Sequence, residues 1–394
     1  MKKEHVLIIR FSALGDVAMT VPVVKALAEQ YPDVHFTMLS RGFARPLFDE
    51  LAPNVSFMEA NLQDEYHGVK GLNALYRRLA AKHFTAIADL HNVLRSDYLR
   101  LRFNLGHFRV EHIDKHRMGK RRLVSKNNKV LEQQPTAIEN YCEVFRKLGY
   151  PITPRSVGFA IRPQGGKAPN GQTLGQGAAE SSPLWGDKRG RGSNSSPLWG
   201  DKRGASIGLA PFAAHRGKIY PRERMEQVVS QLCELHPDCR ILLFGGGKRE
   251  MEVFSQWCNR YPQCVNASAQ CNGLKEELSL MGNLDVMISM DSANMHLASL
   301  VGIPVVSIWG ATHPYAGFMG FGQKEDNAVQ TDLPCRPCSI YGNKPCHRGD
   351  YACLYGIEPS TIINKVENIV GAERRFRPQI NNVLTPKKER NKKK

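Results

Sequence analysis

Strand-like and helix-like segments alternate along most of this chain, and that alternation limits the folds it can adopt. The apolar run His5–Arg10 is typical of a buried strand, and apolar side chains then recur at helical spacing up to Tyr31. The same order returns in the second half, where strand-like Ser206–Leu209 precedes helix-like Arg222–Leu235. Because such a pattern packs best as parallel strands covered by helices, the sequence predicts an α/β fold with two doubly wound halves.

The other elements are expected where the same periodicities recur. We expect further strands at Val34–Leu39, Phe84–Leu90, Arg240–Phe244, Leu284–Met290 and Pro304–Trp309. We expect further helices at Gly71–Lys82, from about Ser96, and at Thr136–Leu148, Lys248–Asn259, Gly273–Gly282, Asp291–Val301 and Pro359–Arg375. The first helix is expected to run unbroken from Val17 to about Tyr31.

A segment rich in Gly, Ser and Pro separates the two halves. It contains one string, SSPLWGDKRG, twice, beginning at Ser181 and at Ser195. Two short copies cannot build a solenoid, and a Trp-anchored binding motif is the alternative to a disordered insertion, which we favour. The predicted domains are therefore residues 1–162, an insertion at 163–204, a second domain at 205–384 and a basic tail at 385–394.

The charge balance favours a phosphate-rich partner. The formal net charge of the chain is +17 at pH 7, which suits a nucleotide, an anionic lipid or a nucleic acid. The basic cluster Lys115–Arg122 fits lipid or lipopolysaccharide phosphates, and no nucleic-acid motif or set of stacking aromatics accompanies it, so we expect no nucleic-acid partner. No apolar run approaches about 20 residues and no signal peptide is visible, so we expect a cytoplasmic protein.

The loop Ser12–Asp16 lies where the first strand is expected to lead into a helix. Gly15 allows close backbone approach, and Asp16 stands at the helix start, either as an ordinary cap or as a general base. The loop contains one glycine, so it is neither a dinucleotide-binding motif nor a P-loop. In doubly wound sheets this position faces the ligand site.

A second strand-to-helix loop spans Asp291–His296. Small residues there let an anion approach the helix N-terminus, where the Ser292 hydroxyl and free backbone N–H groups can donate to a phosphate. Asp291 could accept hydrogen bonds from sugar hydroxyls, and His296 follows in the first turns. The alternatives are an ordinary helix cap and a core histidine.

Three further loops carry candidate residues at strand ends. Lys218 precedes a helix that Pro221 helps to start, and could neutralise a diphosphate or be a surface charge. A Gly-rich turn at 245–247 is followed by Glu250, which could accept from a ribose. The residues that could hold an anionic acceptor after Phe84–Leu90 are His91, Asn92 and Arg95.

Four cysteines near the end of the chain leave two interpretations open. Cys335 and Cys338 form a CxxC pair, and Cys346 and Cys353 follow without that spacing. A structural zinc site is possible but less favoured than packed or redox-sensitive thiols.

Together these motifs resemble glycosyltransferase family 9, the ADP-heptose:lipopolysaccharide heptosyltransferases. The resemblance rests on the order of the motifs in both halves and does not extend to the insertion. Its parts are Ile8–Asp16, Asp89–Ser96, Lys218–Pro221, the Gly-rich turn, Asp291–Ala298 and the pattern Cys335–Cys353. The chain departs from the family pattern at two places. It has Ala213-Ala214-His215 before the lysine, where many relatives have hydroxyl residues, and Ala293 where glycine is common. These departures concern the identity of the donor more than the class of reaction.

The resemblance implies a GT-B fold, in which the acceptor binds the N-terminal domain and the nucleotide sugar binds the C-terminal one. It implies an inverting transfer of a heptose or related sugar, from ADP-heptose or a similar donor, to a lipopolysaccharide core or another lipid-linked acceptor. No metal or other cofactor is then required, and peripheral contact with an anionic membrane surface at the inner face of the inner membrane is expected. The alternatives are a GT-B nucleotide-sugar epimerase and a non-catalytic nucleotide-sugar-binding protein.

The resemblance also implies a role for each candidate residue. Asp16 is the catalytic base, and the acceptor is held by Ser12, His91, Asn92 and Arg95. The donor is held by Lys218, Glu250, Asp291, Ser292, Ala293 and His296.

Overall fold

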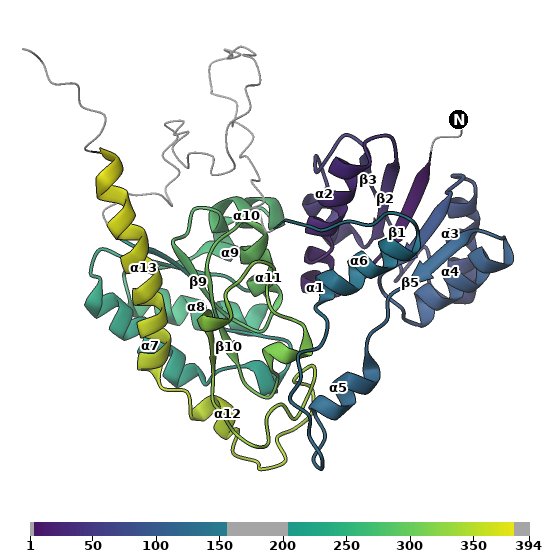
Figure 1. The fold of residues 1–394 in the computed structure, drawn as a ribbon. Helices are drawn as coiled ribbons and strands as arrows, with labels where there is room; N and C mark the ends of the chain where they lie inside the picture. Colours follow the sequence, from purple (N-terminus) through teal and green to yellow (C-terminus); the bar gives the residue numbers. More distant parts are fainter. Residues whose placement is uncertain (1–3, 156–203, 382–394) are drawn as a thin grey trace, which may run out of the picture.

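Two parallel sheets form the framework of this protein. The computed structural model describes residues 4–155 and 204–381, with side chains described as far as residue 371 (Figure 1). The first sheet has the strand order β3-β2-β1-β4-β5, and the second has the order β11-β10-β9-β6-β7-β8. The prediction of two doubly wound halves is confirmed. The predicted insertion, apart from its last residue, and the predicted basic tail lie outside the described residues.

α-Helices connect most of the successive strands in both halves. The strands are β1 His5–Ile9, β2 His35–Ser40, β3 Val55–Glu59, β4 Ala86–Asp89, β5 Arg109–His112, β6 Ser206–Ala210, β7 Arg240–Leu243, β8 Cys264–Asn266, β9 Val286–Met290, β10 Val305–Trp309 and β11 Ala328–Gln330. The α-helices are α1 Leu14–Ala18, α2 Val21–Gln30, α3 Gly68–Ala80, α4 Leu94–Leu105, α5 Arg117–Leu123, α6 Ala137–Lys147, α7 Arg222–Leu235, α8 Lys248–Arg260, α9 Ala267–Gln270, α10 Leu274–Met281, α11 Ala293–Leu300, α12 Ala352–Tyr355 and α13 Pro359–Asn381. Among the helices of the described ranges, none combines the length and the apolar character needed to cross a bilayer.

The central strands were predicted from the sequence, and the edge strands were not. The expected central strands all form, within one or two residues of their predicted bounds. The four strands that were not predicted, β3, β5, β8 and β11, are the outermost strands of the two sheets. Edge strands are covered on fewer sides and tolerate polar residues, so their apolar signal is weak.

The expectation of one unbroken helix after the first strand is wrong. Helix α1 ends at Ala18 and α2 begins at Val21. Pro22 lies in the first turn of α2, and its nitrogen cannot donate a hydrogen bond to the carbonyl of Ala18. The break lets α1 point separately from α2, and α1 is the helix that carries Asp16.

Successive side chains of β1 point alternately to the two faces of the first sheet. Val6 and Ile8 join the cluster beneath α2 and α6, whereas Leu7 and Ile9 join the cluster beneath α3 and α4. This strand is buried on both faces, as expected for the centre of a parallel sheet. Figure 1 shows α3 and α4 at the side of the first sheet remote from the second half.

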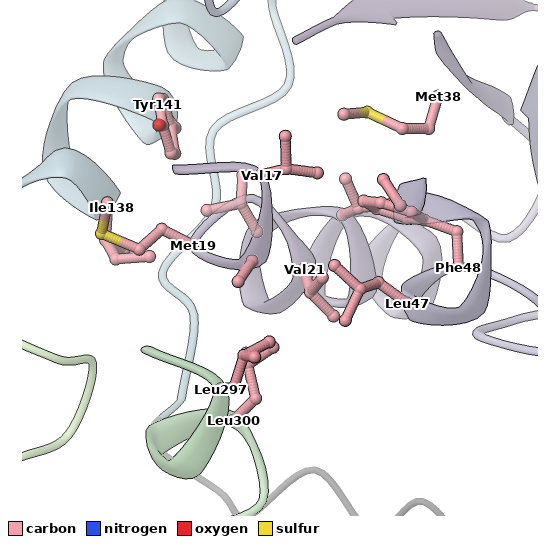
Figure 2. Packing of buried hydrophobic residues seen from close by; sticks show 14 of the residues in the cluster. Val17, Met19, Val21, Met38, Leu47, Phe48, Ile138, Tyr141, Leu297 and Leu300 are labelled. Carbon is pink, nitrogen blue, oxygen red and sulfur yellow. The ribbon is translucent and has the colours of Figure 1, made fainter. Parts of the chain in front are cut away.

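The two halves share one apolar cluster. It contains Val17 and Met19 from the first half and continues through Leu297 and Leu300 of α11 (Figure 2). The chain that leads into α6 and the first residue of that helix add backbone hydrogen bonds to the second half. In these bonds the N–H of Gln134 donates to Tyr315 at 2.9 Å, and the N–H of Ala137 donates to Gly317 at 3.1 Å.

Leu297→Ala is expected to destabilise the protein by about 2–5 kcal/mol, because it removes a buried side chain and leaves a cavity at this junction. Leu297 is 1% exposed, whereas Leu235 at the end of α7 is 57% exposed, so Leu235→Ala serves as the control. Denaturant unfolding followed by circular dichroism measures both. Equal effects of the two substitutions would contradict the packing described.

Candidate active site

The two strand-to-helix loops singled out in the sequence meet at the junction between the halves. Helix α1 packs directly on α11, and Gly15 lies at the point of contact. A methyl group placed on Gly15 would be 2.7 Å from Cδ2 of His296 and 3.3 Å from the Cα of Ala293. Glycine is therefore needed for close approach here, and that approach brings Asp16 beside the N-terminal turns of α11.

Asp16 is held by a buried arginine. Its Oδ2 lies 2.5 Å from Nη2 of Arg10 and also accepts the backbone N–H of Ala13 at 3.2 Å. About a third of the Asp16 side chain is exposed, so the carboxylate is reachable from solvent. Burial by itself would raise the pKa of Asp16, but the charge of Arg10 and the Ala13 N–H outweigh it and hold the pKa below its ordinary value. Asp16 is consequently an ionised carboxylate at neutral pH.

Lys218 and Asp291 form a buried ion pair on the opposite side of the junction. Their Nζ and Oδ2 atoms are 2.8 Å apart, and their side chains are 15% and 4% exposed. Lys218 ends the 3₁₀ turn Arg216–Lys218, which is tied down by a hydrogen bond from the N–H of Gly217 to the carbonyl of Gly342. The sequence predicted that both residues lie in loops after strands, and the fold brings them together as an ion pair.

The N-terminus of α11 is open to an anion. Ser292 is the N-cap residue, but its hydroxyl makes no capping bond and lies 3.2 Å from the hydroxyl of Ser289. The Ser292 side chain therefore leaves the N–H groups of the first turn, which begins at Ala293, without a capping bond. Such a helix terminus favours negative charge.

His296 lies between the two charged groups. It is buried, and its Nδ1 has no hydrogen-bond partner among the described residues. Burial lowers the pKa of His296. The charges of Asp291 and Asp16 oppose this decrease, and the charge of Lys218 adds to it. One neutral ring therefore lies within electrostatic range of the predicted base and of the predicted donor-binding pair.

The predicted acceptor-binding residues after β4, which are His91, Asn92 and Arg95, differ in burial and in hydrogen bonding. His91 is buried, and its Nδ1 accepts the backbone N–H of Phe11 at 3.4 Å; burial and the charge of Arg10 lower the pKa of His91 to about 3. The Asn92 amide donates to the carbonyl of Ile113 at 2.9 Å. Both side chains thus brace the loop, whereas Arg95 is exposed in the first turn of α4.

Glu250 folds back over the Gly-rich turn. Its Oε2 accepts the N–H of Gly246 at 2.7 Å, and burial raises the pKa of Glu250 despite that bond. A methyl group on Gly245 would lie 2.5 Å from the same oxygen. Gly245 therefore leaves room for this carboxyl group.

Ser12 lines a hollow of about 410 Å³ that both halves contribute to. Its other lining residues are Ala13, Leu14, Arg41, Phe43, Leu274 and Glu277. The hollow lies beside the loop that carries Asp16, so a substrate reaching the carboxylate could extend into it.

Sequence reasoning missed the cations that surround Asp16. Arg10 donates to the carbonyl of Leu90 at 2.6 Å as well as pairing with Asp16, and Lys115 donates to the carbonyl of Asn92 at 3.0 Å. Lys120 lies within electrostatic range of Asp16, and its Nζ is 4.5 Å from the centre of the Phe318 ring in the second half. The only sequence signal for the lysines was the basic cluster that contains them.

The cysteine-rich loop is organised by an arginine. Buried Arg336 donates to the carbonyls of Gly310 and Thr312, and burial raises the pKa of Cys353 to about 11. Cys335, Cys338, Cys346 and Cys353 are free thiols. Among the side chains described, those of residues 4–155 and 204–371, no three His, Cys, Asp or Glu are grouped so that they could hold a metal ion.

Comparison with known sequences agrees with the motifs. The profile of "Glycosyltransferase family 9 (heptosyltransferase)" matches residues 72–346. Lipooligosaccharide heptosyltransferase 2 of Campylobacter jejuni is 26% identical over 172 residues, which is 42% of this chain and 50% of that protein. The chain thus spans about half the length of this relative. Lipopolysaccharide core heptosyltransferase OpsX of Haemophilus influenzae is 22% identical over 78% of this chain and 79% of its own.

Comparison with solved structures shows the same fold. A family 9 glycosyltransferase from Veillonella parvula superposes with a TM-score of 0.64 at 16% identity, over 94% of this chain and 98% of that one. The Escherichia coli heptosyltransferase WaaC with ADP superposes with a TM-score of 0.59 at 15% identity, over 93% and 99%. The fold is therefore GT-B, and because the family profile covers more than half of the sequence, the chain belongs to glycosyltransferase family 9.

Proposed function

We propose that this protein transfers a heptose from a nucleotide-heptose donor, ADP-heptose in the first instance, to a lipopolysaccharide core acceptor. The observation that carries the proposal is the meeting of ionised Asp16 with the Lys218–Asp291 pair and the open N-terminus of α11 around His296. Family membership and the names of the relatives support the reaction class. ADP-heptose is supported by the solved complex of WaaC with ADP-2-deoxy-2-fluoro heptose.

The geometry suits a direct displacement. An acceptor hydroxyl attacks the anomeric carbon of the donor, and Asp16 takes the hydroxyl proton as the new bond forms. The bond from the anomeric carbon to the diphosphate breaks, and negative charge grows on the leaving phosphate. Lys218, the Ser292 hydroxyl and the N–H groups that begin at Ala293 face that charge, where electrostatic stabilisation has most effect.

Donor binding would redistribute the Lys218–Asp291 pair. A diphosphate can share Lys218, which frees a carboxylate oxygen of Asp291 to accept a hydrogen bond from the donor sugar. His296 supports this side of the site, and Glu250 is the candidate contact for the ribose. On the acceptor side we keep Ser12, His91, Asn92 and Arg95, of which Arg95 is the most exposed. Metal-independent catalysis, the cytoplasmic location and the division of the chain into four segments stay predictions.

Asp16→Ala is expected to lower heptose transfer by about 10²–10⁴-fold, the usual contribution of a general base, while donor affinity changes little. Lys218→Ala is expected to weaken both donor affinity and transfer, because its charge acts on bound donor and on the leaving diphosphate. Transfer is measured on lipopolysaccharide from a heptose-deficient strain, and donor affinity by calorimetry with ADP.

Exposed residues of the same types provide the controls for these two variants. Asp326→Ala and Lys324→Ala remove matched charges from an exposed turn of the second half, and neither should alter transfer or affinity. Full transfer by Asp16→Ala would remove the base assignment. Isomerisation of the donor sugar without an acceptor would favour the epimerase alternative.

Arg10→Gln is expected to move the acid limb of the kcat/KM profile to higher pH. Asp16 must be ionised to accept a proton, and its pKa lies below the ordinary value of 3.8 because Arg10 outweighs burial. Without Arg10, burial dominates and the pKa rises, so protonation begins at a higher pH. Arg10→Lys keeps the charge and should shift the limb less. Superimposable acid limbs for Arg10→Gln and the wild type would refute the link.

A further inference from the structure

Helix α4 exposes a stripe of leucines on the outer surface of the first half. Leu94, Leu101 and Leu105 are 88%, 56% and 69% exposed. Their spacing of seven and four residues aligns them along one face, and Tyr98 falls on the same line. The opposite face of the helix buries Leu99 and Phe103 in the core. The stripe is therefore additional to the face that holds the helix on the sheet. It is called the α4 leucine stripe below.

Basic residues border the stripe. Helix α4 carries Arg95 and Arg102 as well as Arg100, which is paired with Asp97 and with buried Asp89, and its neighbour α3 carries Lys70, Arg77 and Arg78 and no acidic residue. Arg102 bridges the two helices, donating to Asn73 of α3 and lying over the ring of Tyr76 at 4.5 Å. Exposed leucines bordered by cations match the acyl chains and the phosphates of an anionic lipid layer.

The position of α4 connects the stripe with the active site. The helix begins directly after the loop that carries His91 and Asn92, at the carboxyl end of β4. Leu94 and Arg95 are thus exposed at the edge nearest the site, and Leu105 lies at the far end of the helix. Figure 1 shows α3 and α4 side by side at the end of the molecule remote from the second half, so a flat surface could reach them.

We propose that the α4 leucine stripe docks on an anionic lipid membrane. In its link to the acceptor the inference rests on the proposed function, because a lipid-linked acceptor has its sugars in the site and its acyl chains in the membrane. Docking through α4 would let the acceptor sugars enter the site while the acyl chains stay in the membrane. A second copy of this chain fits less well, since pairing two such surfaces would bring the arginines of α3 and α4 close to those of the partner.

The first test compares vesicles of two compositions in a sedimentation assay. The wild-type protein is expected to bind phosphatidylcholine vesicles containing phosphatidylglycerol at least tenfold more tightly than pure phosphatidylcholine vesicles, with an affinity that falls as salt rises. The double variant Leu101→Ser/Leu105→Ser should bind the anionic vesicles at least tenfold more weakly. Lys70→Gln/Arg77→Gln should bind more weakly and with less dependence on salt.

A matched variant controls for the loss of exposed leucines in general. Leu131→Ser/Leu235→Ser removes two leucines that are 53% and 57% exposed elsewhere, and it should bind vesicles like the wild type. Equal vesicle binding by Leu101→Ser/Leu105→Ser and the wild type would overturn the proposal, as would absence of wild-type binding. A wild-type dimer in light scattering that this variant dissolves would overturn it too, and would assign the stripe to self-association.

An activity measurement separates this inference from the proposed function. Leu101→Ser/Leu105→Ser should transfer heptose to a lipid-free core oligosaccharide at the wild-type rate, and to the same acceptor embedded in anionic vesicles several-fold more slowly. Equal rates of the variant and the wild type on the embedded acceptor would contradict the link to catalysis. Vesicle binding needs no turnover. A protein that binds anionic vesicles through α4 but transfers no heptose would therefore refute the proposed function and leave the docking proposal standing.

Discussion

The packing of α1 on α11 is the contact on which the rest of this structure depends. Gly15 allows it, because any side chain there would meet His296 and Ala293. Apolar residues on both sides, among them Val17 and Leu297, extend the contact into a cluster shared by the two halves (Figure 2). Through this contact the carboxylate of Asp16 on α1 lies beside the N-terminal turns of α11. Neither half contains the candidate site by itself.

The charges at the junction form two pairs with different properties. Arg10 and Asp16 are joined within the first half, and the arginine keeps the carboxylate ionised and oriented. Lys218 and Asp291 are joined within the second half, where their opposite charges lie 2.8 Å apart. A buried ion pair contributes little net stability, because desolvation offsets the attraction between the charges. The second pair is thus well suited to be opened by a diphosphate.

The sequence predicted part of this arrangement. The central strands were predictable because they are buried on both faces and read as unbroken apolar runs, whereas edge strands such as β5, Arg109–His112, carry polar residues. The gathering of Asp16, Lys218 and Asp291 at one edge was predictable because they follow such strands, where parallel sheets bind ligands. The break between α1 and α2 could have been read from Pro22. Lys120 could not have been placed near Asp16, because its own helix is short and lies on a long connection.

The order and spacing of apolar runs and polar loops therefore determined the architecture, the two halves and the positions of the loops that carry the candidate site residues. These properties are local, since periodicity and turn residues act over a few positions. The tertiary structure decided which charges become partners: Arg10 with Asp16, Lys218 with Asp291, and Lys120 with Phe318. It also decided that His91 and Asn92 brace their loop and that α4 exposes its leucines. Pairing and exposure depend on how distant segments pack in space, and no single stretch of sequence specifies that packing.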